Sequence, residues 1–457
     1  MVASSLTMTV SERLANWATT QHVSDFPSDV SLFAKRLIID SLGLQVRGST
    51  LRHVQPQRRL VESAGSRAES TITATGFRST MASAAYVNGT FAASMEFDEC
   101  NMLPWHSASI VVPTSLAVVE AHHRPGSDLL LGTVVGQQVQ SLLGTAVSVP
   151  LMERGWHLPR AMGPFAATAA AGSILRADEV VLAHAFGVAA GDASGPMEYD
   201  RAGGEVKRQY TGSAARAGIE ALQLAIDGVT GPSTIFEGTS GLFRLMAGTS
   251  EASIPDDAWN TWYITDTFFR LNPGVGTVLP ALEVVADVAT TERINWREIE
   301  KIDVGLPAFA VSHGGNIIEP TDSLAAHFSL AFALALRLVT GASAPADYLD
   351  SEVWSNPDIL VVASKVRPFA MEFAADAPLL CADVRITMAD GRILGRLQHG
   401  FHGHTTDPVS DADIEAKFHA NTEGILPESN KSRIIEMVHN IEYMDDIEPL
   451  VALLNPL

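Results

Sequence analysis

Three short stretches of the sequence place carboxylates, histidines and basic residues where the surrounding chain is apolar. The first, EFDECNMLPWHSASIVVP, gathers Glu96, Asp98, Glu99, Cys100 and His106. The second, ERGWHLPRAMGPF, holds His157 just before an expected helix start. The third, GGEVKRQYTGSAARAG, holds Lys207, Arg208 and Tyr210 ahead of another helix. Basic side chains and helix N-termini suit a carboxylate or phosphate, and histidine transfers protons near neutrality.

Each of these residues, taken singly, also has a purely structural explanation. A lone His106 or His157 is more often a buried histidine with its hydrogen bonds satisfied, and neighbouring carboxylates often cap helices or lie in a solvated turn. Lys207 with Arg208 is typical of a surface pair. The functional hypothesis therefore depends on the stretches occurring together.

Several other kinds of site are disfavoured. His399, His402 and His404 in HGFHGHTT resemble a metal cluster, but they lie in a glycine-rich connector without a clear fourth ligand, so we expect a loop. The two cysteines, Cys100 and Cys381, fit no metal spacing. The sequence has no nucleophile elbow, dinucleotide fingerprint, phosphate loop or His-Glu-x-x-His motif, which disfavours hydrolases, dehydrogenases, nucleotide-binding proteins and zinc proteases.

The amino-acid composition disfavours negatively charged macromolecules and surfaces as binding partners. The 457 residues include 31 Lys and Arg against 52 Asp and Glu, a formal charge of −21, so nucleic acid and anionic membrane surfaces are poor partners. No apolar run approaches the roughly 20 residues that span a bilayer. We expect a cytoplasmic protein in a reducing compartment that binds a small anion where a few cations converge.

The elements that must position these residues are mostly helices. Apolar residues at helical spacing recur from about residue 9 to 250, for example in residues 28–48, in residues 127–147 and in a helix opening at Gly163 and Pro164. Near residue 295 the pattern changes to a strand, one long buried helix ending at Gly341 and a hairpin with an Asp390-Gly391 turn. We expect a mainly α fold, in which a helical domain (1–264 and 401–457) is interrupted by a smaller inserted α+β lid domain (265–400).

The stretches also occur in a familiar order. The segments NGTFAASMEFDEC, HSASIVVP, GWHLPRAMGPFAATAAA, GGEVKRQYTGSAARAG and DPVSDADIEAKF together resemble the MmgE/PrpD family, over essentially the whole chain. That family includes 2-methylcitrate dehydratase, cis-aconitate decarboxylase and iminodisuccinate epimerase. The resemblance implies a homodimer of two-domain subunits without metal or organic cofactor. It also implies a site between the domains that acts on small di- or tricarboxylates.

The resemblance assigns roles to individual residues. His106 falls on a family histidine and is the leading acid or base, with His157, Lys207 and Tyr210 as further catalytic candidates. The candidates for substrate binding are Glu96, Asp98, Cys100, Arg208 and Arg270. Lys207 is expected to hold a substrate carboxylate and to stabilise developing charge, because proton removal beside a carboxylate builds negative charge on an existing anion.

Some positions depart from the family pattern. Asp98, Glu99 and Cys100 stand where relatives usually carry Asp-Asp followed by Thr or Tyr, and Tyr210 replaces a histidine. In FRLNPGVG, Arg270 replaces a lysine and Asn272 a tyrosine. Arginine binds a carboxylate bidentately but is a poor proton donor. Carboxylate anchoring is therefore retained, whereas proton transfer by that lysine is lost.

Three reactions remain open at this stage. We expect first a cofactor-independent lyase that dehydrates a citrate or alkylcitrate by α-proton abstraction. The segment HSASIV reads closest to decarboxylase-type members, which keeps decarboxylation of cis-aconitate as an alternative, and the altered FRLNPGVG keeps the epimerase. A carboxylate-binding protein without catalysis is the alternative from another class.

Overall fold

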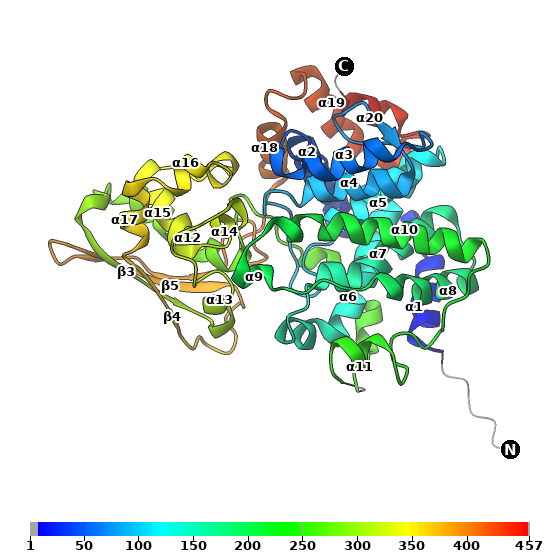
Figure 1. Cartoon of the computed structure of the whole chain (residues 1–457), viewed down its shortest axis with the longest axis horizontal. Coiled ribbons are helices and arrows are strands. Elements are labelled where there is room, and N and C mark those ends of the chain that lie inside the picture. The colour runs from blue at the N-terminus through cyan, green and yellow to red at the C-terminus, as the bar shows by residue number, and fades with distance from the viewer. Residues whose placement is uncertain (1–7, 250, 456–457) are drawn as a thin grey trace.

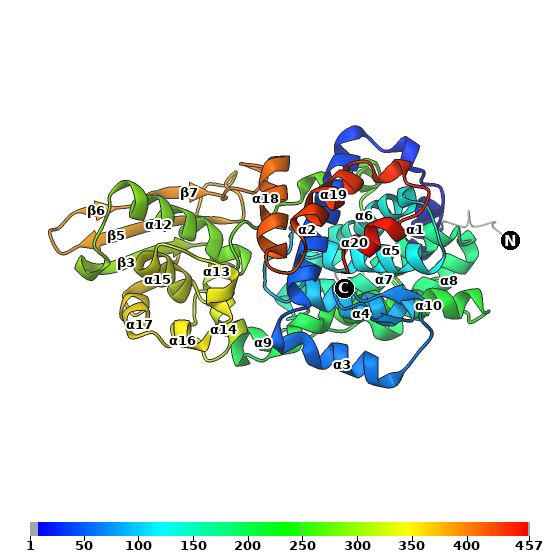
Figure 2. The ribbon, with the colours of Figure 1, turned by 90° about the horizontal axis from the view of Figure 1, so that it is seen from above.

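The computed structural model describes residues 8–249 and 251–455. Figures 1 and 2 show a larger body of packed helices beside a smaller part that contains a sheet. The predicted mainly α fold class with a small α+β part is confirmed.

The larger body combines helices from both ends of the chain. Its helices are α1 (Val10–Thr19), α2 (Ser28–Gly48), α3 (Gln55–Ala64), α4 (Met81–Ala92), α5 (Ala108–Ala121), α6 (Gly126–Glu153), α7 (Leu158–Leu175), α8 (Glu179–Ala189), α9 (Tyr199–Ala202), α10 (Tyr210–Ile226), α11 (Leu242–Met246), α18 (Asp411–Thr422), α19 (Glu428–His439) and α20 (Glu448–Leu453). A two-stranded antiparallel ribbon, β1 (Ser70–Thr71) with β2 (Arg78–Ser79), completes it. Helices α18 and α19 pack against α2, which joins the last segment of the chain to the first.

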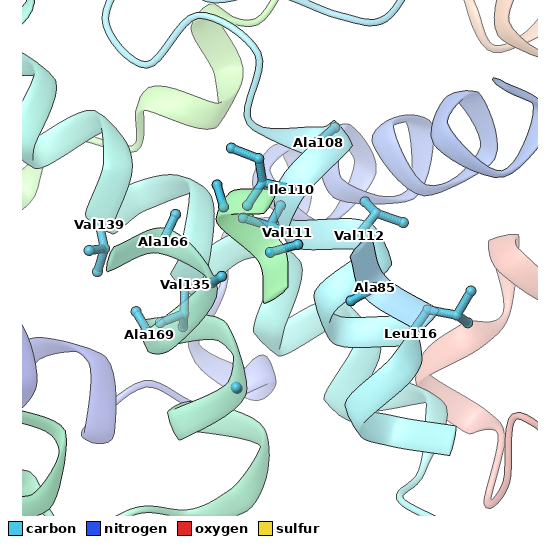
Figure 3. Close-up of a cluster of buried hydrophobic side chains, with 14 of the residues drawn as sticks. Ala85, Ala108, Ile110, Val111, Val112, Leu116, Val135, Val139, Ala166 and Ala169 are labelled. Carbon is cyan, nitrogen blue, oxygen red and sulfur yellow. The ribbon is translucent and has the colours of Figure 1, made fainter. Parts of the chain in front are cut away.

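The core of the helical body depends on small residues between helices that are apolar nearly all round. Figure 3 shows Val111 of α5, Val135 of α6 and Ala166 of α7 within one buried cluster. Gly136 allows the closest approach, because a Cβ there would lie 2.7 Å from Val111 Cγ1 and 2.8 Å from the Ala166 carbonyl oxygen. This packing fixes the ends of α5 and α7, where His106 and His157 lie.

The α+β part places helices against a mixed sheet. Its helices are α12 (Leu279–Thr291), α13 (Ala308–Ser312), α14 (Ser323–His327), α15 (Leu330–Thr340), α16 (Ser351–Trp354) and α17 (Pro357–Ala363). Its strands are β3 (Ile299–Leu306), β4 (Val366–Ala370), β5 (Cys381–Met388), β6 (Ile393–Leu394) and β7 (Leu397–His399). The strand order is β4-β3-β5-β6 with β7 also on β5, and only β3 and β4 run parallel. Helices α12, α15 and α17 lie on one side of the sheet in Figure 1.

The predicted hairpin is confirmed and two helix predictions are wrong in their boundaries. Gly391 has φ 85° in the β5–β6 turn, a conformation that glycine adopts freely. Helix α7 begins at Leu158, directly after His157 as the second stretch predicted, rather than at Gly163, because Pro159 fits a first turn that needs no N–H donor, and Pro164 is accommodated inside the helix. The expected single helix ending at Gly341 is split into α14 and α15, because the Ser329 hydroxyl accepts from Phe332 N (3.0 Å) and starts a new helix.

The two larger clusters of buried hydrophobic residues correspond to the two parts of the chain. One is formed by residues of the helical body and includes Phe418 and Leu450 from the last helices, whereas the other is centred on the sheet and α15. The domain boundaries at 264/265 and 400/401 stay a prediction. Within the described residues, no helix has the length and apolar character needed to cross a bilayer.

Candidate active site between the two parts

A cavity of about 690 Å³ lies between the helical body and the α+β part. Residues of the body that line it include Glu96, His106 and Lys207. Arg270, in the segment leading to the α+β part, lines it together with His313. The structure therefore brings residues from widely separated stretches of the sequence to one cavity.

Glu96 and Lys207 form a buried ion pair at this cavity. Lys207 lies on the 3₁₀ helix Glu205–Gln209, and its Nζ donates to Glu96 Oε1. Arg270 Nη1 lies 3.7 Å from the other oxygen, Glu96 Oε2. Burial opposes ionisation of Glu96, but Lys207, Arg270 and His106 outweigh it and hold the pKa of this carboxyl well below its usual range. Glu96 is therefore an anion that holds two cations in place.

Asp98 fixes the position of Arg270. Arg270 Nη2 lies 2.5 Å from Asp98 Oδ1, its Nε donates to the Asp98 carbonyl oxygen (2.6 Å), and its Nη1 donates to the Gly274 carbonyl oxygen (2.8 Å). The other carboxylate oxygen of Asp98 accepts from the Ser109 hydroxyl (2.5 Å). Burial acts against the charge on Asp98, yet His106 and Arg270 lower its pKa. The guanidinium is thus held by three acceptor oxygens, one for each of its nitrogens.

His106 is held in one tautomer. Its Nδ1 lies 2.8 Å from the Glu99 carbonyl oxygen, which only accepts, so Nδ1 carries the hydrogen. Nε2 has no hydrogen-bond partner in the described part of the chain. Burial lowers the pKa of His106 to about 4, although Asp98 acts in the opposite direction. At neutral pH His106 is therefore neutral, and the lone pair on Nε2 can accept a proton.

Glu99 has a structural role. Its Oε1 accepts from the backbone N–H groups of Ser107 and Ala108 (both 2.6 Å) at the start of α5. Burial raises the pKa of Glu99 to about 8, against the effect of these hydrogen bonds. Of the three clustered carboxylates, two hold cations at the cavity and the third caps a helix.

Cys100 also lines the cavity, but its sulfur is not a nucleophile. Burial raises the pKa of the Cys100 thiol to about 12, so the side chain is a thiol at neutral pH. The backbone of Cys100 pairs with that of Phe268 across the two parts of the chain. Cys100 therefore shapes the wall and connects the parts.

Four of the predicted site residues do not line the cavity: Asp98, described above, and His157, Tyr210 and Arg208. His157 is buried, and its ring centroid lies 6.4 Å from that of His106 and 5.4 Å from that of Tyr210. Tyr210 donates through its hydroxyl to the Pro196 carbonyl oxygen (3.1 Å). Arg208 donates to Glu205, to the Ser94 carbonyl oxygen and to Ser323 Oγ (2.7 Å), which joins α14 to the helical body. The predicted roles of His157, Tyr210 and Arg208 on the substrate stay predictions.

The cavity lining also includes His313, Asp200 and Tyr199, which were not among the predicted site residues. His313 Nδ1 lies 2.5 Å from Asp200 Oδ2, so the two parts of the chain meet at an Asp–His pair. Tyr199 is buried, and its hydroxyl has no partner within the described residues. Burial raises the pKa of Tyr199 well above its usual value, so it remains a protonated phenol. The available signal was the pair Tyr199-Asp200, which stands just before the Lys207 stretch.

Two of the three histidines considered as metal ligands, His402 and His404, instead contact neighbouring side chains of their own loop. His402 Nδ1 lies 3.2 Å from Asp407 Oδ2, and His404 Nδ1 bonds the Thr406 hydroxyl at 3.0 Å. Across residues 8–249 and 251–455, no three His, Cys, Asp or Glu side chains are grouped so as to hold a metal ion.

Two domain models of one known protein family match this chain. The MmgE/PrpD N-terminal domain matches residues 12–255, and the MmgE/PrpD C-terminal domain matches residues 276–443. The chain belongs to the MmgE/PrpD family. Membership supports a lyase-type activity and confirms the family predicted from the sequence.

Curated relatives align over nearly the whole chain. Human cis-aconitate decarboxylase is 28% identical over 440 residues, which cover 92% of this chain and 89% of the human protein. Cis-aconitate decarboxylase of Aspergillus terreus is 27% identical over 471 residues, covering 98% and 96% of the two chains. A cis-aconitate decarboxylase-like protein of Aspergillus oryzae is 26% identical over 480 residues, covering 98% and 97%.

Proposed function

We propose that the protein is a carboxy-lyase that decarboxylates a tricarboxylate of the cis-aconitate type. The observation that carries the proposal is the cavity that Lys207, Arg270 and His106 line together, with the two cations held in place by Glu96 and Asp98. The names of the relatives support decarboxylation over the dehydration that we expected first.

The reaction can be written so that its electrons balance. The bond between the leaving carboxylate and its CH₂ carbon breaks and releases CO₂, and its electron pair forms a new C=C bond. The electrons of the old double bond move to the carbon beside a retained carboxylate, and that carbon then takes a proton. Negative charge grows on the retained carboxylate, where fixed cations such as Lys207 and Arg270 stabilise the transition state.

The proton is assigned to His106. Burial keeps this histidine neutral at neutral pH, but a bound trianion favours the imidazolium because opposite charges raise a histidine pKa. Substrate and proton therefore bind together, and Nε2–H then donates to carbon. Asp98, whose Oδ2 lies 3.4 Å from His106 Nδ1, stabilises the charged ring.

Dehydration is the second candidate, and a specific observation favours it. A neutral His106 can remove an α-proton, while the phenol of Tyr199, which has no hydrogen-bond partner among the described residues, can protonate a leaving hydroxyl in the same cavity. This pair of groups needs no change in protonation before the substrate binds.

One experiment distinguishes the candidates. The protein is incubated in deuterated water with cis-aconitate, citrate, 2-methylcitrate and iminodisuccinate, and the products are followed by NMR. We expect CO₂ release from cis-aconitate with one deuterium in the product. New alkene signals from citrate or 2-methylcitrate, with cis-aconitate unchanged, would replace the proposal with dehydration. Deuteration of iminodisuccinate without net loss would replace it with epimerisation.

A further inference from the structure

The buried cations of the cavity are already paired with carboxylates. Lys207 donates to Glu96, and Arg270 is held by Asp98, which lies outside the lining. Arg154 is the third cation among the lining side chains that the structure describes, and it is exposed, so solvent screens its charge. A bound polyanion therefore meets little uncompensated positive charge from these three residues.

Further carboxylates line the same cavity. Glu153, Glu198 and Asp200 belong to the lining, and each adds negative charge that opposes a polyanion. Groups that become positive as the ligand binds would offset this repulsion. Two described side chains of the lining can do so near neutral pH, His106 from the helical body and His313 from the α+β part.

His313 is oriented with one ring nitrogen available. Its Nδ1 lies 2.5 Å from Asp200 Oδ2, and a carboxylate oxygen only accepts, so Nδ1 carries the hydrogen. Nε2 has no hydrogen-bond partner among the described residues. The side chain is 23% exposed and belongs to the cavity lining, so a ligand in the cavity can reach it.

The position of His313 is fixed by its neighbours. Its ring packs edge-on against Phe328, with centroids 5.4 Å apart, and lies 6.3 Å from the ring of Trp105. The Thr277 hydroxyl donates to the His313 carbonyl oxygen (2.7 Å) directly after α13. The imidazole is therefore placed at the cavity by contacts that do not involve a ligand.

Asp200 of α9 is the charged group that contacts His313. Its second oxygen, Oδ1, is buried without a hydrogen-bond partner in the described part of the chain, so His313 is the donor to this carboxylate. Other titratable groups around the ring include His157 and Lys207, whose Nζ lies 5.3 Å from the centroid of Phe328. A carboxylate on one ring nitrogen stabilises an imidazolium that forms by protonation of the other.

We propose that His313 is a second proton-accepting residue of this site, which takes up a proton at Nε2 when a polycarboxylate binds and then holds one of its carboxylates through Nε2–H. Asp200 is the positioning residue of the pair. The proton comes from solvent, and Nδ1 keeps its hydrogen toward Asp200. The inference rests on the proposed function for the class of ligand, but it does not depend on which bond the reaction breaks.

Calorimetry with an unreactive ligand measures the proton uptake. Tricarballylate is a tricarboxylate without the double bond or the hydroxyl group that the two candidate reactions require. Its binding is measured at pH 8 in two buffers that differ in heat of ionisation, and the difference in heat gives the number of protons taken up. We expect about two protons for the unmodified protein, one at His106 and one at His313.

His313→Asn is the matched variant, because the asparagine amide keeps a donor for Asp200 and places nothing at Nε2. Proton uptake should fall by about one, and Kd should rise about tenfold, as expected for loss of a hydrogen bond between charged groups. His402→Gln, at an exposed histidine outside the lining, should change neither value. His313→Gln serves if His313→Asn does not fold. Proton uptake as large as that of the unmodified protein would overturn the inference.

Asp200→Asn tests the positioning residue, because it removes the charge and keeps the histidine. The number of protons taken up should fall toward that of His313→Asn, since the imidazolium loses its carboxylate partner. A purely structural role of Asp200 would leave the proton number unchanged, and that result would remove Asp200 from the proposal.

Turnover reports on the proposed function separately. If His313→Asn takes up fewer protons with tricarballylate while the unmodified protein does not decarboxylate cis-aconitate, the role of His313 stands and the reaction must be revised. If cis-aconitate is decarboxylated but tricarballylate does not bind, or binds with the same proton uptake in His313→Asn, the reaction stands and the role of His313 is rejected.

Discussion

At the scale of single residues, the site depends on which ring nitrogen of His106 is free. The backbone carbonyl oxygen of Glu99 accepts a hydrogen bond from His106 Nδ1, and its carboxylate accepts one from the Ala108 N–H at the start of α5. Glu99 therefore fixes both the imidazole ring and the helix that follows it. The geometry leaves Nε2 as the atom that can exchange a proton with a substrate.

His106→Ala should therefore lower kcat by at least about 100-fold while the fold is retained, as expected for loss of a positioned acid or base. Steady-state kinetics on the substrate found by NMR measure the loss, and circular dichroism checks the fold. His402→Ala, which removes a histidine from an exposed loop, is the control and should keep full activity. Near-normal turnover by His106→Ala would remove this residue from the mechanism.

The sequence could predict part of this site. Residue types and the family resemblance selected five residues that all line the cavity: Glu96, Cys100, His106, Lys207 and Arg270. Arg208 was paired with Lys207 in the sequence, but consecutive residues of a 3₁₀ helix point about 120° apart, so its side chain lies away from the cavity.

The contribution of the α+β part could not be predicted in this way. His313 reaches Asp200 only because α13 packs beside α9 at the junction of the two parts. No spacing within the sequence records a contact between residues that lie 113 positions apart.

At the scale of elements, apolar periodicity predicted which segments are buried helices but not where each begins. Helices α5, α6 and α7 are apolar nearly all round, and the sequence shows this directly. The start of α7 depends on Pro159, and the break between α14 and α15 depends on Ser329. Other residues nearby are equally good helix starts by sequence alone, so the pattern did not identify these two.

The packing of α10 on α4 gives a test at this scale. A Cβ at Gly212 would lie 2.0 Å from the Tyr86 carbonyl oxygen and 2.5 Å from Thr90 Oγ1. Since a backbone atom cannot move aside, Gly212→Ala should reduce the free energy of unfolding by about 3 kcal/mol, measured by urea denaturation. Gly191→Ala, where no atom lies within 4 Å of the added Cβ, is the control and should change it by less than about 0.5 kcal/mol. Equal stabilities of the two variants would contradict the close approach of α4 and α10.

At the scale of the whole molecule, the two parts are joined by buried polar residues as well as by the chain. Arg208 links the end of α4 to α14, and the Asp200–His313 pair and the Cys100–Phe268 backbone pairing cross the same junction. The cavity lies at this junction, so any relative movement of the parts changes the site. The homodimer stays a prediction.

The free energy of unfolding should depend on pH, because the junction contains a buried neutral histidine, His327. His327, close to the junction, is buried with its ring centroid 4.9 Å from that of Tyr348 and its Nδ1 2.6 Å from the Ser323 carbonyl oxygen. Burial, with a further contribution from Arg208, lowers its pKa to about 3. The unfolded chain, where a histidine pKa is about 6.5, therefore binds a proton that the native state does not.

The native state therefore loses stability relative to the unfolded chain as the pH falls. The stability that the neutral His327 contributes is complete above pH of about 6.5 and is lost as pH falls toward about 3, with a loss of about 2 kcal/mol already at pH 5. His327→Gln removes the titrating group, so its free energy of unfolding should fall by about 2 kcal/mol less between pH 7 and pH 5 than that of the unmodified protein. Urea denaturation at both pH values measures this, with His402→Gln as the exposed control that should fall as much as the unmodified protein. Equal falls in all three proteins would mean that His327 is not buried as a neutral ring, and the junction around Ser323 and Arg208 would then need another arrangement.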